Sequence, residues 1–282
     1  MESLKILTIR NCNVRKLIWR NNSSRKLIYS INGITSIEST VDLKKVKFFE
    51  KFHNKWWDKT DDLALLHDMN RLRVQFVQDG LANTGINKDD TNLSLKGIKI
   101  ADIGCGGGIF SEPLASLGAE ITGIDKSFEL INVAREHASL DSSLSGRLNY
   151  IQTTIEEFEK VNKEKFDVVI ASEILEHVFN QQYFLKACSS ILKPGGSLFV
   201  TTTNKTLQSW LAGFTAEYIL NILAIGTNEW DKFISPEEVQ RLLETYGLET
   251  KLVRGMIFNL IKYKWCWSSN ISMNYALQAV KQ

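Results

Sequence analysis

The chain has 282 residues, 44% hydrophobic and 23% charged, which suffices for one sizeable α/β domain and is short for two full enzymatic domains. Its net charge of +2 gives no sign of a nucleic-acid-binding surface over the whole molecule, so we expect no nucleic-acid partner. No uninterrupted apolar stretch reaches the roughly 18 residues of a membrane span, so we expect no transmembrane helix.

The first 40 residues differ in composition from the rest. Between Met1 and Ser39 lysines and arginines far outnumber the acidic residues, which are only Glu2 and Glu38. A basic, acid-poor segment with serines, asparagines and spaced apolar residues is typical of a mitochondrial transit peptide. A disordered basic tail has the same composition, so both interpretations stay open. We expect residues 1–40 to be a leader and residues 41–282 to form the main domain.

The main domain begins with a helical segment and continues as alternating strands and helices. We expect helices at about 46–82, followed by a polar loop. Strands are predicted at 98–103, 120–124, 148–152, 166–171 and 197–202, and helices at 110–117, 128–138 and 183–192. This alternation predicts a parallel sheet covered on both faces. Residues 193–196 (K-P-G-G) read as a turn before the last of these strands.

A second helical segment interrupts the core at about residues 206–230. It ends before a helix that Ser235 caps and Pro236 begins. Within it an apolar stripe runs along one helical face. The stripe is either core, or a lid or surface helix that docks on a bilayer. Its members are Leu207, Trp210, Leu211, Phe214 and Tyr218.

A glycine-rich loop follows the first predicted strand of the core. It reads D-I-G-C-G-G-G from Asp102, with Gly104 first among the glycines, and it opens a helix. Glycine lets a bound nucleotide approach the backbone closely. Asp125 ends the next strand about 20 residues later, where a carboxylate can accept both ribose hydroxyls. The fingerprint of a dinucleotide-binding site requires a small residue at position 109, and Ile109 fits it poorly. Asp102 also suits a cationic sulfonium better than a pyrophosphate, which favours S-adenosylmethionine as the cofactor.

An acidic cluster follows the strand 166–171, at the sheet edge where ligands bind in open α/β folds. If a helical turn begins there, Glu173, Glu176 and His177 lie on one face. Two carboxylates and an imidazole together can bind a divalent cation. The simpler alternative is that these acids lie at the solvent-exposed start of a helix, where the helix dipole stabilises them.

These motifs, with L-K-P-G-G before the fifth strand, resemble the class I methyltransferases. The chain further resembles the ubiquinone-biosynthesis O-methyltransferases from about Phe48 to Lys281. The resemblance rests on W-W-D, L-H-x-M-N-x-L-R, G-C-G-G-G and S-E-x-L-E-H. It also includes a segment that is G-A-E-Y-I-L in the family and begins with Thr215 here. It implies an α/β, Rossmann-like fold with a mostly parallel seven-stranded sheet and helices on both faces.

Carried over by position, the resemblance implies two sets of site residues. The cofactor S-adenosyl-L-methionine is expected on Arg73, Gly104, Asp125 and Ser172. A magnesium ion, with manganese or zinc as alternatives, is expected on Glu173, Glu176 and His177. The general base is not identified, although Glu173 or His177 can serve if no metal binds. Arg73 suits the carboxylate of the cofactor as a bidentate partner.

The resemblance also implies a substrate and a location. The acceptors are polyprenylated catechols or hydroquinones, 3,4-dihydroxy-5-polyprenylbenzoate and demethylubiquinol, methylated on one hydroxyl. The expected location is mitochondrial, peripheral on the matrix side of the inner membrane, in a complex with other ubiquinone-biosynthesis proteins. The alternatives are a methyltransferase of the same class that acts on a soluble small molecule, and a non-catalytic subunit of a membrane-associated complex.

Overall fold

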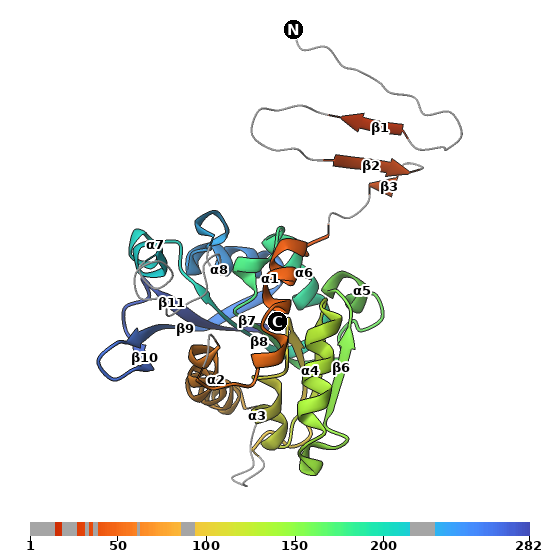
Figure 1. Ribbon diagram of the computed structural model, residues 1–282. Coiled ribbons are helices and arrows are strands. Elements are labelled where there is room, and N and C mark those ends of the chain that lie inside the picture. Colours follow the sequence, from red (N-terminus) through yellow and green to blue (C-terminus); the bar gives the residue numbers. More distant parts are fainter. Residues whose placement is uncertain are drawn as a thin grey trace. The chain divides into compact units, whose positions relative to one another are not determined.

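The structure is a computed structural model that describes residues 15–18, 27–31, 34–35, 39–60, 63–85, 94–214 and 229–282 (Figure 1). The chain divides into two compact units, Met1–Ser39 and Thr40–Gln282. In the first unit three short strands form an antiparallel sheet. They are β1 (Arg15–Ile18), β2 (Leu27–Ile31) and β3 (Ile34–Thr35).

An eight-stranded sheet forms the centre of the second unit, in the order β10-β9-β11-β8-β7-β4-β5-β6. The five strands from β4 to β8 pair in parallel, and β11, β9 and β10 continue the sheet antiparallel. The strands are β4 (Lys99–Ile103), β5 (Glu120–Asp125), β6 (Leu148–Gln152), β7 (Phe166–Ser172), β8 (Leu192–Thr203), β9 (Leu248–Asn259), β10 (Lys264–Ser268) and β11 (Asn274–Lys281). The predicted mostly parallel α/β sheet is confirmed.

The sheet has one strand more than the seven expected, because the chain after β9 folds back as a hairpin and adds β10 at the edge. This strand holds the helix α2 (Ala64–Asn83). The backbone amide of Trp265 donates to Asp68 Oδ2 at 2.7 Å, and its indole Nε1 donates to the carbonyl of Leu65 at 3.0 Å. The eighth strand therefore supports the helix that carries Arg73.

The predicted turn at residues 193–196 lies inside β8 rather than before it. Phe166 pairs with Leu192, and Val168 pairs with Ser197, so five steps on β8 face two steps on β7. Gly195, with φ 77°, permits this irregularity because a residue with a Cβ rarely adopts that backbone conformation. The predicted turn is therefore not a separate element before the strand but an irregularity within β8, which runs from Leu192 to Thr203.

Several helices begin where a short polar side chain accepts a hydrogen bond from a free backbone amide. The Ser127 side chain caps α4 by accepting from the amide of Leu130, and Ser235 caps α8 by accepting from Glu238. The other helices of this unit are α1 (Leu43–Glu50), η1 (His53–Lys55), α3 (Ser111–Ser116), α4 (Phe128–Ala138), η2 (Ser142–Leu144), α5 (Ile155–Glu159), η3 (Leu175–His177), α6 (Gln181–Ile191), α7 (Leu207–Phe214), η5 (Trp230–Lys232) and α8 (Pro236–Thr245).

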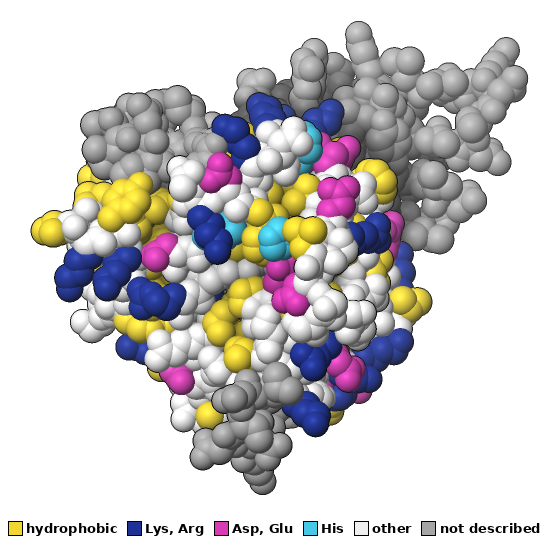
Figure 2. All heavy atoms as spheres, turned by 60° about the horizontal axis from the view of Figure 1, so that its bottom comes forward, with side chains coloured by type: hydrophobic (Ala, Val, Ile, Leu, Met, Phe, Trp, Pro, Cys, Tyr) yellow, Lys and Arg dark blue, Asp and Glu magenta, His cyan; other side chains and the backbone are white. Residues whose placement is uncertain are grey.

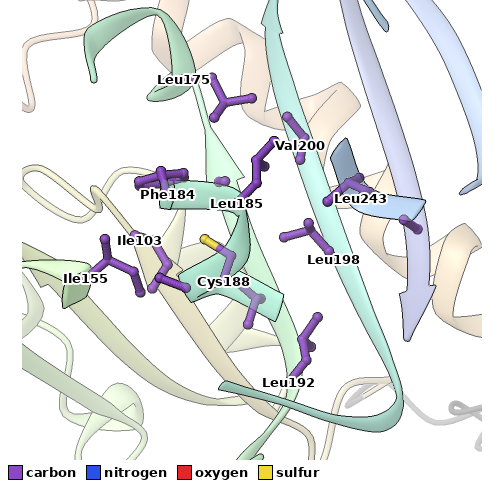
Figure 3. Close-up of a cluster of buried hydrophobic side chains, with 14 of the residues drawn as sticks. Ile103, Ile155, Leu175, Phe184, Leu185, Cys188, Leu192, Leu198, Val200 and Leu243 are labelled. Atoms are coloured by element: carbon purple, nitrogen blue, oxygen red, sulfur yellow. The ribbon is translucent and has the colours of Figure 1, made fainter. Parts of the chain in front are cut away.

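Apolar side chains fill both faces of the sheet. On one face they pack with α5, α6 and α8, and Figure 3 shows Leu198 and Val200 of β8 in this cluster beside Leu185 and Cys188 of α6. On the other face Ile100 and Ile170 pack with α2 and α3 in a second cluster. Parallel strands buried on both faces leave their carboxyl ends as the open edge of the fold, where ligands bind.

Three residues of the apolar stripe have described side chains on α7, and all three are exposed: Leu207 by 65%, Trp210 by 43% and Leu211 by 49%. The side chain of Phe214 and all of Tyr218 lie outside the described residues. A core role is therefore wrong for these three residues. Among the described residues no helix is both long and apolar enough to cross a membrane.

Candidate functional site

One cavity of about 720 Å³ opens at the carboxyl ends of β4, β5 and β7. Figure 2 shows a face on which hydrophobic, acidic and histidine side chains meet near the middle, with lysine and arginine side chains around them. The cavity is lined by every residue that the sequence places in a site, namely Arg73, Gly104, Asp125, Ser172, Glu173, Glu176 and His177. Residues up to 104 positions apart in the sequence thus line the same cavity.

The glycine loop and Asp125 are directly connected at one end of the cavity. Gly104 and Gly106 both have a left-handed backbone, with φ 77° and 52°, which glycine adopts without strain. The amide of Gly106 donates to Asp125 Oδ2 at 3.0 Å, and the amide of Ser127 donates to its Oδ1 at 2.8 Å. Burial raises the pKa of Asp125, and these two amides act against that rise. A carboxylate is thus fixed beside the loop backbone.

Asp102 lies beneath the loop and is only 2% exposed. The hydroxyl of Ser111 donates to its Oδ2 at 2.6 Å. Burial raises the pKa of Asp102 to about 6, which the Ser111 hydrogen bond and Arg73 partly oppose. A cationic ligand in the cavity would therefore find a buried carboxylate that it can stabilise in the ionised form.

Arg73 projects from α2 and is 3% exposed. Its guanidinium donates to Ser172 Oγ at 3.0 Å, to the carbonyl of Leu66 at 3.0 Å and to the amide oxygen of Asn70, while Nε has no partner. Burial lowers the pKa of Arg73 to about 10, which leaves it charged at neutral pH. Hydrogen bonds from several directions hold this cation at the cavity wall.

Ser172 ends β7 and is linked to the neighbouring strand. Its hydroxyl lies 2.7 Å from Thr201 Oγ1 of β8. The amide of Glu173 donates to the carbonyl of Thr201 at 2.8 Å, and Thr202 Oγ1 donates to Glu176 Oε2 at 2.7 Å. These two threonines were missed from the sequence, although a run of threonines at the carboxyl end of a core strand is the signal that identifies them.

Glu173 and Glu176 lie in an environment that disfavours their charged forms. Burial and the neighbouring Glu173 raise the pKa of Glu176 to about 8, and burial also raises the pKa of Glu173. Glu173 Oε1 is enclosed and has no hydrogen-bond partner. Protonation or a bound cation can offset the charge of two carboxylates in this environment.

The expected helical face for Glu173, Glu176 and His177 is not present. A 3-10 turn covers only Leu175–His177, and Glu173 precedes it in the left-handed region with φ 53°. The three residues line the same cavity, yet among the described residues no three His, Cys, Asp or Glu side chains are grouped closely enough to hold a metal ion. The departure follows from the sharp turn after β7, which rotates Glu173 away from helical register.

His177 is held as a neutral imidazole. Burial lowers its pKa to about 3, and the cations Lys45 and Lys232 act in the same direction. Its ring lies edge-on to Phe49 at 5.0 Å between centroids, and its Nδ1 is enclosed without a partner. A neutral imidazole with an unsatisfied nitrogen can accept a proton or coordinate a metal.

A partly buried ion-pair network beside this cluster was not predicted. Asp42 is 4% exposed and pairs with Lys232. Lys45 Nζ lies 3.0 Å from Glu229 Oε1, and Lys232 Nζ lies 3.1 Å from Glu229 Oε2. About 190 residues separate the two halves of the network, so no local spacing in the sequence points to it.

The remaining wall of the cavity is apolar and aromatic. It is formed by α1 and the residues after it, by α7, and by the hairpin of β9 and β10. Such a wall suits a hydrophobic acceptor next to the polar cofactor end. Its large side chains include Phe48, Phe49, Phe52, Leu211, Phe258, Leu260 and Trp265.

Comparison with protein families and structures agrees with this geometry. The model of a methyltransferase domain matches residues 69–252. A solved structure of magnesium protoporphyrin IX methyltransferase from Synechocystis superposes with a TM-score of 0.59 at 19% identity, covering 84% of this chain and 95% of that one. At this identity the likeness shows the fold, and the Rossmann-like methyltransferase architecture is confirmed.

Relatives of much higher identity are known. The mitochondrial ubiquinone biosynthesis O-methyltransferase of Rattus norvegicus is 45% identical over 260 residues, covering 92% of this chain and 73% of that protein. The human protein of that name is 45% identical over 86% of this chain, which spans 66% of its length. The ubiquinone biosynthesis O-methyltransferase of Hahella chejuensis is 38% identical, covering 88% of this chain and 98% of that protein.

Proposed function

This chain belongs to the ubiquinone biosynthesis O-methyltransferases, and we propose that it methylates a ring hydroxyl of the polyprenylated intermediates 3,4-dihydroxy-5-polyprenylbenzoate and demethylubiquinol. It is an S-adenosylmethionine-dependent O-methyltransferase of mitochondria. The observation that carries the substrate proposal is the single cavity, which combines a glycine loop and fixed carboxylate at one end with an aromatic wall at the other. A polar nucleoside and an apolar prenyl tail require a cavity with one polar and one apolar region.

The cofactor residues are proposed from their position and charge. Asp125, beside the loop of Gly104, accepts the ribose hydroxyls, and Arg73 binds the carboxylate of the methionine moiety. Ser172 fixes the guanidinium from the other side. Asp102 would supply negative charge to the cationic sulfonium. Together these groups would hold the cofactor at the polar end of the cavity.

Methyl transfer forms a bond between the acceptor oxygen and the methyl carbon while the bond from that carbon to sulfur breaks. S-adenosylhomocysteine leaves as a neutral thioether, and the hydroxyl proton must be accepted nearby. If no metal ion binds, Glu173 is placed to accept this proton, with a free Oε1 and a pKa that burial raises, whereas a pKa of about 3 makes His177 a weak base. Holding the two reactants in line lowers the barrier further.

A divalent cation, magnesium before manganese or zinc, is proposed for Glu173, Glu176 and His177. The donor set fits in its chemistry: two carboxylates with raised pKa values and unsatisfied atoms on Glu173 and His177. As placed, the three do not form a ready ligand cage. When bound, such an ion would lower the pKa of a coordinated acceptor hydroxyl. Calorimetric titration of magnesium into the parent and Glu176→Gln tests this, since equal heats would exclude these ligands.

The location on the matrix side of the inner membrane and a complex with other ubiquinone-biosynthesis proteins are also proposed. The exposed apolar side chains of α7 lie next to the cavity, which Leu211 lines. A prenylated acceptor is itself confined to the bilayer, so an enzyme that contacts the membrane beside its cavity can receive the acceptor directly.

The direct test is turnover of a short-chain polyprenyl dihydroxybenzoate with labelled cofactor, with and without magnesium. We expect label in the ring methoxy group, and weaker turnover of a catechol acid that lacks the prenyl tail. Equal turnover of the two acceptors would favour a soluble small-molecule substrate. Binding of the cofactor without turnover of any catechol would favour a non-catalytic subunit.

A further inference from the structure

Trp57 joins the segment after α1 to the glycine loop. Its indole Nε1 donates to the carbonyl of Gly107 at 3.0 Å. Its ring stacks on His137, with centroids 3.4 Å apart and an interplanar angle of 1°. The same indole therefore contacts the loop through its edge and α4 through its face.

His137 is in turn fixed by Glu112. Its Nδ1 lies 2.8 and 2.9 Å from the two carboxylate oxygens of Glu112, which is 8% exposed. Glu112 belongs to α3, which the glycine loop opens, and His137 belongs to α4, which starts shortly after Asp125. The contacts among Trp57, Glu112 and His137 thus link the two segments that build the nucleoside end of the cavity.

Trp56, the neighbour of Trp57, makes this linkage relevant to the cavity itself. It is 6% exposed and lines the cavity. A Cβ added to Gly106 or Gly107 would collide with its ring, so the indole lies directly on the loop backbone. A displacement of Trp57 would move Trp56 and alter the wall beside Gly106.

We propose that Trp57, His137 and Glu112 form a clamp that fixes the glycine loop and α4 in the geometry that binds the nucleoside cofactor. The inference rests on the proposed function, because it takes the loop and Asp125 as the cofactor site. The clamp residues do not line the cavity, so they act as positioning residues through Trp56 and the loop. Nothing in the reaction itself requires them, and their effect belongs to cofactor affinity.

A double-mutant cycle on the full chain tests the clamp, with S-adenosylhomocysteine affinity measured by calorimetry. Trp57→Leu removes the stack and the hydrogen bond, and Glu112→Leu removes the anchor of His137 with little change in volume. We expect each to weaken binding about tenfold. The double variant should be about as weak as Trp57→Leu alone, because the anchored His137 contributes only through its stack on Trp57. Additive losses near a hundredfold, or unchanged affinities, would overturn the proposal.

The matched control is Tyr183→Leu. Tyr183 also joins two elements through a polar contact, its hydroxyl donating to Glu159 Oε1 at 2.8 Å, yet it does not line the cavity. This substitution should leave the affinity for S-adenosylhomocysteine unchanged. An equal weakening of binding would overturn the clamp, because it would show that any loss of packing lowers the affinity. If Trp57→Leu does not fold, Trp57→Phe keeps a stacked ring, loses only the bond to Gly107 and should bind about threefold more weakly. Unchanged binding by folded Trp57→Phe would contradict the proposal. A parent protein that binds no S-adenosylhomocysteine would instead refute the proposed cofactor site.

Discussion

At the scale of single residues, burial of Asp102 makes its ionisation sensitive to the charge of a bound ligand. Its carboxyl lies almost completely out of solvent, with the Ser111 hydroxyl as a direct donor. Because the pKa is raised to about 6 from 3.8, the folded protein binds this proton more tightly than the unfolded chain does. Ionisation of Asp102 therefore lowers the stability of the ligand-free protein as pH rises from about 4 to about 6. A sulfonium cation in the cavity would offset that cost.

We predict that affinity for S-adenosylmethionine increases as pH rises from 5 to 7.5, because Asp102 ionises in this window. S-adenosylhomocysteine, a neutral thioether, should show a smaller increase. Calorimetry across this pH range with both ligands measures the difference. In Asp102→Asn the two ligands should respond to pH alike, and a difference that persists in this variant would assign the effect to another group.

At the scale of elements, α7 stands out because its apolar face is turned outward beside the cavity. Leu207 and Trp210 are exposed in a helix that has no acidic or basic residue in its first or last turn. An apolar, uncharged face of this kind is suited to the boundary between headgroups and acyl chains of a bilayer.

Replacing Leu207 and Trp210 together with serine is expected to reduce sedimentation with liposomes severalfold and to leave the fold intact, because both side chains are exposed. Far-ultraviolet circular dichroism verifies the fold. Val161→Ser, a change at an exposed apolar residue in the turn after α5, serves as the control. Unchanged sedimentation of the double variant would exclude α7 as the membrane contact.

Some elements were predictable because local periodicity and caps determine them. The expected helix at 128–138 and strand at 148–152 match α4 and β6, and Ser235 caps α8 as the sequence indicates. The turn after β7 and the bulge in β8 were not predictable, since register with neighbouring strands decides both. The proposed site residues were predicted from local motifs, and they line one cavity. The separation of the proposed metal ligands was not predicted, because it depends on the turn after β7.

At the scale of the whole described unit, ion pairs of Asp42, Lys45, Glu229 and Lys232 connect the start of α1 to the 3-10 helix η5, and the pair of Asp42 with Lys232 is buried. Asp42 also caps α1 by accepting from the amide of Lys44 at 2.9 Å. Its side chain therefore combines a helix cap with an ion pair between segments 190 residues apart. Asp42 and Lys45 of the network line the cavity together with His177. Burial lowers the pKa of His177, and Lys45 and Lys232 lower it further.

We expect Asp42→Ala to lower the free energy of unfolding by about 3 kcal/mol, since it removes a helix cap and leaves Lys232 without its buried partner. Urea denaturation measures this. The pKa of Asp42 is lowered in the fold, so its contribution should be present above about pH 4 and fall away in more acidic solution. Glu249→Gln, at an exposed ion pair with Lys251, should have almost no effect. A similarly small effect of Asp42→Ala would show that the network does not stabilise the unit.

Asp125 is the central residue of the proposed cofactor site, because its carboxylate would hold the ribose of the cofactor. Calorimetric titration of S-adenosylhomocysteine into the parent protein and into Asp125→Ala measures this directly. We predict at least about a hundredfold loss of affinity, because two hydrogen bonds to a charged acceptor disappear. Equal dissociation constants for the two proteins would contradict the account.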